Sequence, residues 1–391
     1  MKKVPPEYHG REQSLLKHKF LTEYLRAWAH KLGSHARSRT LRLWYVDVFA
    51  GPWASADADL RDTSIHIGIQ ALEEAAQTWR DKDEVKIDVG AIFVEKDPHA
   101  FSRLRDYLHQ HDGLVETHPL QGEFGRRVAD IERLIGDDPA FIFVDPTGFK
   151  GAQMQFIAPL TEPRYRDVLI NVMFNHVNRW KDDPRAFLRR QMRAFFGLDD
   201  SELPAKLSET ELLRLYRRQL KRTCDIKWAA DISVPHPTND RTWFRLVVGG
   251  KHPKILEVFR DAERKVIGIE AAIIREDARV RRTEQTPLFS AEETAGPEEL
   301  RYARQRDEDL ARVRPMLLEH LGDGQSPWQE IWPVLLEDLH LTLSELSRAC
   351  FEVYRAGELL VSPRPRPKRR TLHDDDLLSL PSAPLDVGER T

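Results

Sequence analysis

The sequence predicts an α/β fold: a doubly wound, mostly parallel, Rossmann-like sheet that ends in an antiparallel hairpin and precedes a small C-terminal domain. Short apolar runs end at Asp47, Glu95 and Asp145, as strands buried on both faces of a parallel sheet do. Helical patterns separate these runs, which indicates right-handed βαβ crossovers. Two later strand-like segments, 229–234 and 242–249, lie close together in sequence and fit a closing hairpin.

The elements follow one another in the order that such a sheet requires. Apolar residues at helical spacing predict a first helix over 15–32, which Gly33 ends. The acid and hydroxyl residues at 62–64 offer an N-cap for the helix after the first strand. The expected strands are 43–49, 91–94, 114–119, 141–144 and 168–174, and the expected helices between them are 62–79, 98–109, 125–134 and 156–160.

The second half of the chain predicts a different organisation. Arg-rich amphipathic helices are expected over 185–196 and 209–221, and a helix over 254–266 packs on the hairpin. We expect the α/β domain to span 1–270, followed by a charged linker with exposed helix over 271–309, and a disordered tail over 363–391. Between them, 310–362 shows three short helices and a small hairpin, which is the outline of a winged helix; a small helical cap is the alternative.

Composition excludes several classes of protein. A chain of 391 residues with 41% hydrophobic and 31% charged residues fits a globular protein of two or more domains. The net charge of −3 argues against a wholly basic nucleic-acid coat protein. Cys224 and Cys350 are the only cysteines, which excludes a disulfide framework and a cysteine-based zinc cluster. With no signal peptide and no apolar segment of membrane-spanning length, we expect a cytoplasmic protein with no membrane contact.

The turn after the first strand suggests a cofactor site. Asp47 stands at the strand end, and Gly51 lets the backbone approach a ligand closely. Phe49 and Pro52 make this turn bulkier than the three-glycine dinucleotide fingerprint, which favours a ligand without phosphates, such as S-adenosylmethionine. Asp47 would then accept from the ammonium group of that cofactor. A buried turn with a capping Asp is an equally weighted alternative.

Two further strand ends extend this predicted cofactor site. Glu95 is placed to bind both ribose hydroxyls, as acids do in nucleotide-binding sheets. Lys96 and Asp97 are candidates to flank the adenine, although Asp97 is equally suited to cap the next helix. Glu123 is a candidate for the adenine amino group, with a surface-loop position as the favoured alternative.

The acceptor side is predicted at the end of the strand 141–144. Asp145-Pro146 followed by an aromatic is similar to the loop with which amine methyltransferases bind an exocyclic amine, but Thr147-Gly148 departs from that loop. Phe149 is a candidate for base stacking, and a turn that closes the site is the alternative. Asn175 and His176 are the other catalytic candidates, with His176 as general base; a lone loop histidine is more often without function.

Several of these motifs together resemble the three-Cys-motif partner protein family, over about residues 14–265. The resemblance implies a class I methyltransferase fold with S-adenosylmethionine as cofactor. It also implies association with a separate three-cysteine protein similar to radical S-adenosylmethionine enzymes, and a C-terminal winged helix in some members. The motifs that carry it are Lys17-His18 with Tyr24 and Trp28, the segments 45–52, 93–97 and 143–148, and 244–249 leading to Lys251-His252-Pro253-Lys254.

Two hypotheses about function remain open. The first is an S-adenosylmethionine-dependent methyltransferase that acts on nucleic acid, with a three-cysteine protein as its candidate partner. The second is a non-catalytic protein that binds nucleic acid or a protein partner on a degenerate methyltransferase fold. The Arg-rich helices and the winged-helix outline motivate the nucleic-acid part of both; the arginines concerned are Arg189, Arg190, Arg193, Arg214, Arg217 and Arg218.

Overall fold

The computed structural model describes residues 4–35, 40–51, 55, 60–81, 86–173, 185–198, 208–235, 242–283, 297–322 and 324–381. The chain divides into two compact units, residues 1–299 and residues 300–391. Among the helices within these described ranges, none combines the length and the apolar character that a membrane crossing requires.

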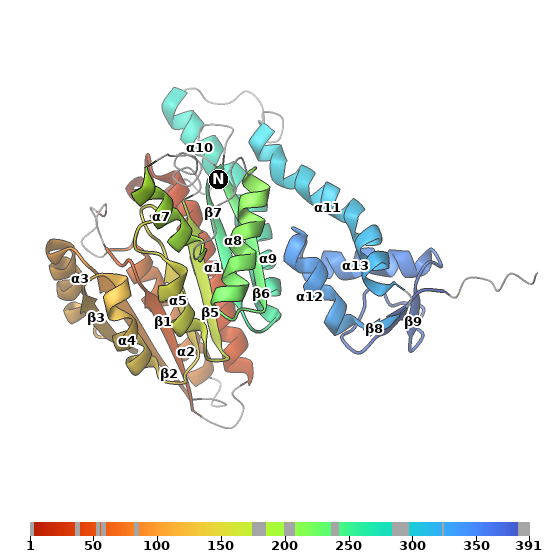
Figure 1. Cartoon of the computed structure of the whole chain (residues 1–391), viewed down its shortest axis with the longest axis horizontal. Helices are drawn as coiled ribbons and strands as arrows, with labels where there is room; N and C mark the ends of the chain where they lie inside the picture. The colour runs from red at the N-terminus through yellow and green to blue at the C-terminus, as the bar shows by residue number, and fades with distance from the viewer. Residues whose placement is uncertain are drawn as a thin grey trace, which may run out of the picture. The chain divides into compact units, whose positions relative to one another are not determined.

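A seven-stranded sheet forms the centre of the first unit (Figure 1). Its strand order is β3-β2-β1-β4-β5-β7-β6. Strands β1 to β5 pair in parallel, whereas β7 runs antiparallel to both β5 and β6. The predicted doubly wound sheet with a closing hairpin is therefore confirmed. The strands are β1 (Leu41–Asp47), β2 (Ile87–Glu95), β3 (Val115–Gln121), β4 (Ala140–Val144), β5 (Arg166–Val172), β6 (Trp228–Pro235) and β7 (Thr242–Gly250).

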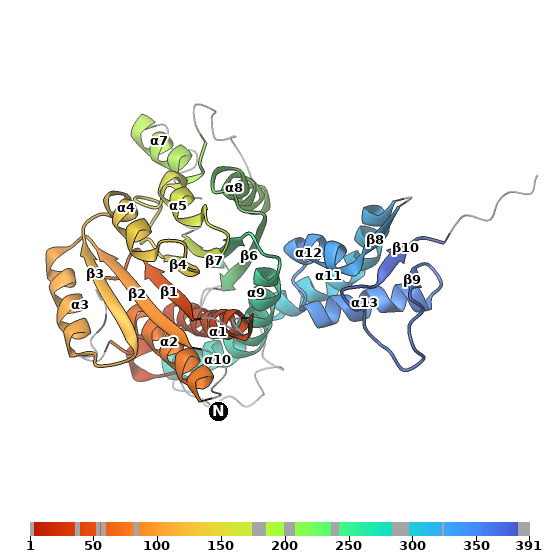
Figure 2. The ribbon, with the colours of Figure 1, turned by 90° about the horizontal axis from the view of Figure 1, so that it is seen from below.

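Helices cover both faces of this sheet. Figure 2 shows α4, α5 and α8 on one face and α1, α2 and α10 on the other. The helices expected from the sequence in this unit all form, with ends shifted by a few residues, and α10 forms in addition. They are α1 (Glu12–His35), α2 (Ser64–Arg80), α3 (Pro98–Gln110), α4 (Phe124–Ile135), α5 (Met154–Thr161), α7 (Ala186–Phe195), α8 (Glu209–Thr223), α9 (Lys254–Lys265) and α10 (Ala271–Thr283), with a π-helical stretch, η2 (Val266–Glu270), joining the last two.

Helices α1 and α2 each pack closely against the central strands of the sheet. The Tyr45 ring lies against α2 at Gly68, where a Cβ would stand only 2.2 Å from that ring, so a glycine is required there. Tyr24 of α1 packs on Phe141 of β4 with ring centroids 5.2 Å apart. At the start of α2, the Thr63 hydroxyl caps the helix by accepting from the amide of His66, as the 62–64 segment predicts. These contacts hold the two helices against the central strands of the sheet.

The prediction of a linker with exposed helix over 271–309 is wrong for residues 271–283. Ile274 and Ala278 of α10 are buried. The charges that suggested a linker are used in contacts within this unit: Asp277 accepts from the amide of Val4 at 3.1 Å, and Arg281 pairs with Glu12 at 3.1 Å. Residues 271–283 therefore belong to the first unit, and helix α11 already begins at residue 297.

The second unit combines three helices with a three-stranded antiparallel sheet of order β8-β10-β9. Along the chain the order is helix, strand, helix, helix, strand, strand. Trp328, Trp332 and Phe351 form much of its buried core. The elements are α11 (Pro297–Leu321), β8 (Gln325–Pro327), α12 (Trp328–Asp338), α13 (Leu343–Arg355), β9 (Leu360–Ser362) and β10 (Leu377–Ser379).

The prediction of a disordered tail over 363–391 is wrong for residues 363–381. Strand β10 pairs with both β8 and β9, and Leu378 is fully buried. The long connection between β9 and β10 is held by an ion pair between Arg369 and Asp376 and by the Ser347 hydroxyl, which accepts from the amide of Leu372 at 2.8 Å. Sequence composition alone hides these contacts because the segment is rich in proline and charge. The rest of the predicted tail lies outside the described residues.

Candidate functional site

The carboxyl edge of the parallel strands gathers the predicted acids. Asp47 of β1 is in register with Phe93 of β2 and with Phe143 of β4. Glu95 and Asp145 therefore each stand two residues further along a neighbouring strand. The connections after β1 and after β4 lead to opposite sides of the sheet, so this point is the switch in strand order, where ligands bind in open α/β sheets.

Asp47 is a fully buried carboxyl. Its oxygens accept from the Ser64 hydroxyl at 2.6 Å, from the amide of Phe49 at 3.1 Å and, more weakly, from the Tyr45 hydroxyl at 3.5 Å. Burial nevertheless dominates and raises the pKa of Asp47 to about 7. No cation pairs with this carboxylate among the described residues, so a ligand ammonium would supply a partner that the chain does not.

Glu95 ends β2 as a mostly buried side chain. One oxygen accepts from the amide of Asp97 at 2.6 Å, which turns the carboxylate toward the strand end. Burial raises the pKa of Glu95 above its ordinary value, against the lowering effect of this hydrogen bond. Within the part of the chain that the structure describes, Glu95 has no cationic partner either.

Asp145 is held from two sides. The ammonium of Lys17, on α1, lies 2.5 Å from one carboxylate oxygen, and the amide nitrogen of Asn171, on β5, donates to the other at 2.6 Å. The remaining amide oxygen of Asn171 is buried without a hydrogen-bond partner. The sequence analysis assigned Lys17 no role, because 128 residues separate Lys17 from Asp145.

The other predicted site residues fall into three groups. Gly51 and Pro146 lie in the turns after β1 and β4, as expected, and Phe49 packs edge-on against Phe124 with centroids 6.0 Å apart. Lys96 and Glu123 are exposed, and Glu123 lies 3.8 Å from Arg126, which fits the surface-loop alternative. Pro52, Asn175 and His176 lie outside the described residues.

Two sequence interpretations are settled by local contacts. Asp97 caps α3, since its carboxylate accepts from the amides of His99 and Ala100 at 3.0 and 2.9 Å, so its capping alternative is the correct one. Phe149 is 7% exposed and belongs to the hydrophobic core. The prediction that Phe149 offers a base-stacking face is therefore wrong, because the ring is already covered by protein. Ser64, which holds Asp47, was noted only as part of a helix cap.

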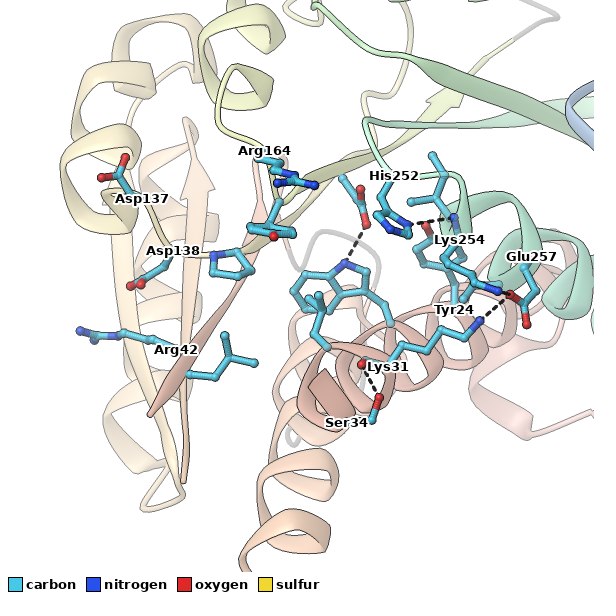
Figure 3. A pocket seen from close by; sticks show the side chains of 18 of the residues that line it. Tyr24, Lys31, Ser34, Arg42, Asp137, Asp138, Arg164, His252, Lys254 and Glu257 are labelled. Atoms are coloured by element: carbon cyan, nitrogen blue, oxygen red, sulfur yellow. Dashed lines mark hydrogen bonds and ion pairs between the residues drawn. The ribbon is translucent and has the colours of Figure 1, made fainter. Parts of the chain in front are cut away.

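A cavity of about 750 Å³ opens at the opposite edge of the same sheet (Figure 3). Its walls come from the second half of α1, from the segments that lead into β1, β4 and β5, and from the start of α9. It lies at the amino ends of the parallel strands, so it contains none of the predicted site residues. This cavity could not be predicted from the sequence, because five separate segments form it.

No protein-family model matches the chain, and no curated protein matches it. Solved structures do match. The O-methyltransferase TomG from Streptomyces achromogenes, in complex with SAM, is 17% identical over 60% of this chain and 80% of its own, with a TM-score of 0.32. Loganic acid methyltransferase with SAH is 11% identical over 73% and 92%, with a TM-score of 0.31. The cyclopropane synthase MmaA2 from Mycobacterium tuberculosis is 11% identical over 65% and 78%, with a TM-score of 0.26. Such distant neighbours do not assign an activity to this chain.

Proposed function

We propose that this protein is an S-adenosylmethionine-dependent methyltransferase. The observation that carries the proposal is the pair of buried acids, Asp47 and Glu95, at the ends of adjacent strands beside the switch point. Both carboxylates lack a cationic partner among the described residues. An amino-acid ammonium at Asp47 and ribose hydroxyls at Glu95 would satisfy both of them. The parallel sheet closed by the antiparallel β7 also fits the class I methyltransferase fold that the resemblance to the three-Cys-motif partner family implies.

When bound, S-adenosylmethionine supplies an electrophilic methyl group on a sulfonium. The chain's own contribution is orientation. Asp47 and Glu95 fix the two ends of the cofactor, and the turn at Phe49 and Gly51 lets the backbone approach it. Asp145, clamped by Lys17 and Asn171, stands on the acceptor side.

We propose nucleic acid as the acceptor class. On α7 and α8, Arg190, Arg214 and Arg218 are exposed. In the second unit, the element order supports our inference of a winged helix, and residues 363–376 between β9 and β10, here called the basic loop, would be its wing. Arg369 anchors this loop internally through Asp376. Arg364, Arg366, Lys368 and Arg370 on the same loop are exposed, which suits contacts with phosphates. Asp374 and Asp375, at its far end, offset part of this charge.

The second candidate function is a non-catalytic binding protein, and one observation favours it. Both carboxylate oxygens of Asp145 are already engaged, one by Lys17 and one by Asn171. An acceptor amine would have to displace Lys17 to reach this carboxylate. A three-cysteine protein as partner, and membership of the family that it names, stay predictions from the resemblance.

Titration calorimetry with S-adenosylmethionine tests the cofactor directly, and the absence of binding at millimolar concentration would overturn the proposal. Transfer of a labelled methyl group to total cellular nucleic acid, split afterwards by DNase and RNase, tests the acceptor. Cofactor binding without transfer to nucleic acid, in the presence and absence of cell extract, would favour the non-catalytic candidate. Asp145→Asn is the variant to compare with the wild-type protein in the transfer assay, since it keeps the shape of the side chain and removes its charge.

A further inference from the structure

The cavity at the amino edge of the sheet is separate from the proposed methyl-transfer site. Asp167 lines the cavity, and Asn171 of the same strand contacts Asp145 at the other edge. Four residues of extended strand place them about 13 Å apart. Two motif segments that methyl transfer does not explain also line it: one holds Tyr24 and Trp28, the other His252 and Lys254.

The unusual group in this cavity is the carboxyl of Asp167. It is 9% exposed, and one oxygen accepts from the indole nitrogen of Trp28 at 2.8 Å. The backbone crowds the other oxygen, because a Cβ on Gly250 would lie only 2.3 Å from it. Burial raises the pKa of Asp167 to about 7. Across the described ranges no cation pairs with it, and a buried carboxylate without a cation is costly.

The cations around the cavity are engaged elsewhere. Lys31 and Lys254 both reach Glu257, at 2.8 and 3.1 Å (Figure 3). Arg42 pairs with Glu116, outside the cavity. The guanidinium of Arg164 lies over the ring of its neighbour Tyr165, 5.4 Å from the centroid. None of these four side chains therefore supplies a cation to Asp167.

The walls suit an apolar body. Trp28 and Tyr165 contribute aromatic rings, and Leu32, Leu41 and Ile255 contribute aliphatic surface. A volume of about 750 Å³ is within the range of small-molecule sites. A metal ion is a poor fit, because the described residues contain no cluster of three or more potential ligands.

We propose that this cavity binds a small organic cation, an ammonium group on an apolar body, with the ammonium at Asp167 and the body against Trp28 and Leu32. The ammonium supplies the charge and the hydrogen-bond donors that Asp167 lacks, and the rings add cation–π attraction. The proposal does not depend on methyl transfer.

Benzylamine is the probe, and benzyl alcohol is its neutral counterpart of similar shape. Titration calorimetry on the full chain should show saturable binding of benzylamine at millimolar concentration, and binding of benzyl alcohol about 10–100-fold weaker, as loss of a charge-assisted hydrogen bond implies. Asp167→Asn keeps an acceptor for the Trp28 indole and should weaken the binding of benzylamine by a similar factor. Asp106→Asn, at an exposed acid 3.5 Å from Arg105, is the matched control and should change nothing.

Leu32→Trp tests the same site without touching the carboxyl, should Asp167→Asn fail to fold. It places a larger ring beside Trp28, where the apolar body would lie, and should weaken benzylamine binding while leaving the circular dichroism spectrum unchanged. Equal affinity for benzylamine and benzyl alcohol, or unchanged affinity for benzylamine in the folded Asp167→Asn protein or in Leu32→Trp, would overturn the proposal.

Discussion

Binding of S-adenosylmethionine is expected to release a proton from Asp47. Burial raises the pKa of this carboxyl to about 7, although Ser64 and the amide of Phe49 stabilise its charged form. A cofactor ammonium at Asp47 would favour the charged form further, so any protonated fraction must lose its proton on binding. Lowering the pH through 7 should therefore weaken binding of the cofactor.

The magnitude follows from that pKa. The carboxyl is roughly nine-tenths ionised at about pH 8 and roughly one-tenth ionised at about pH 6. The dissociation constant should accordingly rise about tenfold over this interval, or about 1.4 kcal/mol. At about pH 6, binding should release close to one proton. Titration calorimetry measures the affinity, and repeating it in buffers of different ionisation enthalpy counts the protons.

Two variants separate Asp47 from other acids at this edge. Asp47→Asn should remove the pH dependence and weaken binding at about pH 8 by about tenfold or more. Glu123→Gln, at an exposed acid on the neighbouring turn, should retain the affinity and the pH dependence. A wild-type affinity that stays flat between about pH 8 and about pH 6, with no buffer-dependent heat, would show that Asp47 does not bind the ammonium.

Three other outcomes are expected. Glu95→Gln should weaken the binding of S-adenosylmethionine by about tenfold in calorimetry and leave the thermal unfolding midpoint nearly unchanged. A lowered midpoint would instead point to a structural role of Glu95. Lys17→Met should lower the free energy of unfolding by about 1–3 kcal/mol in denaturant titrations, because it leaves the partly buried Asp145 without its cation; an unchanged midpoint would contradict the geometry. Glutamine at positions 364, 366 and 368 of the basic loop should reduce the slope of log affinity for duplex DNA against log salt by up to about 2.7, and an unchanged slope would remove this loop from the interface.

The strand ends could be predicted from sequence because each depends on local information. An apolar run that stops at an acid marks both the strand and the edge at which its side chain emerges, and parallel pairing then brings Asp47, Glu95 and Asp145 to one place. The same reasoning cannot find Lys17. Its approach to Asp145 depends on how α1 lies across the sheet, and that placement comes from the packing of Tyr24 on Phe141.

The wrong predictions concern segments whose charged side chains form ion pairs within the protein. Arg281 of α10 pairs with Glu12, which is 269 residues away in sequence, and Arg369 pairs with Asp376 across the basic loop. In the sequence both segments have the composition of solvated chain. Burial of Ile274 in one and Leu378 in the other requires tertiary partners that composition does not reveal.

The motif segments that carry the family resemblance lie at both edges of the sheet. Methyl transfer at the carboxyl edge therefore explains only some of them. The segments around Asp47, Glu95 and Asp145 meet at the carboxyl edge. The Tyr24–Trp28 and His252–Lys254 segments instead line the cavity at the amino edge. Helix α1 serves both edges, since Lys17 and Trp28 both lie on it, and β5 does so through Asn171 and Asp167. A function confined to the proposed cofactor site therefore accounts for only part of the motif set. The carboxyl of Asp167 offers a way to test what the other segments do.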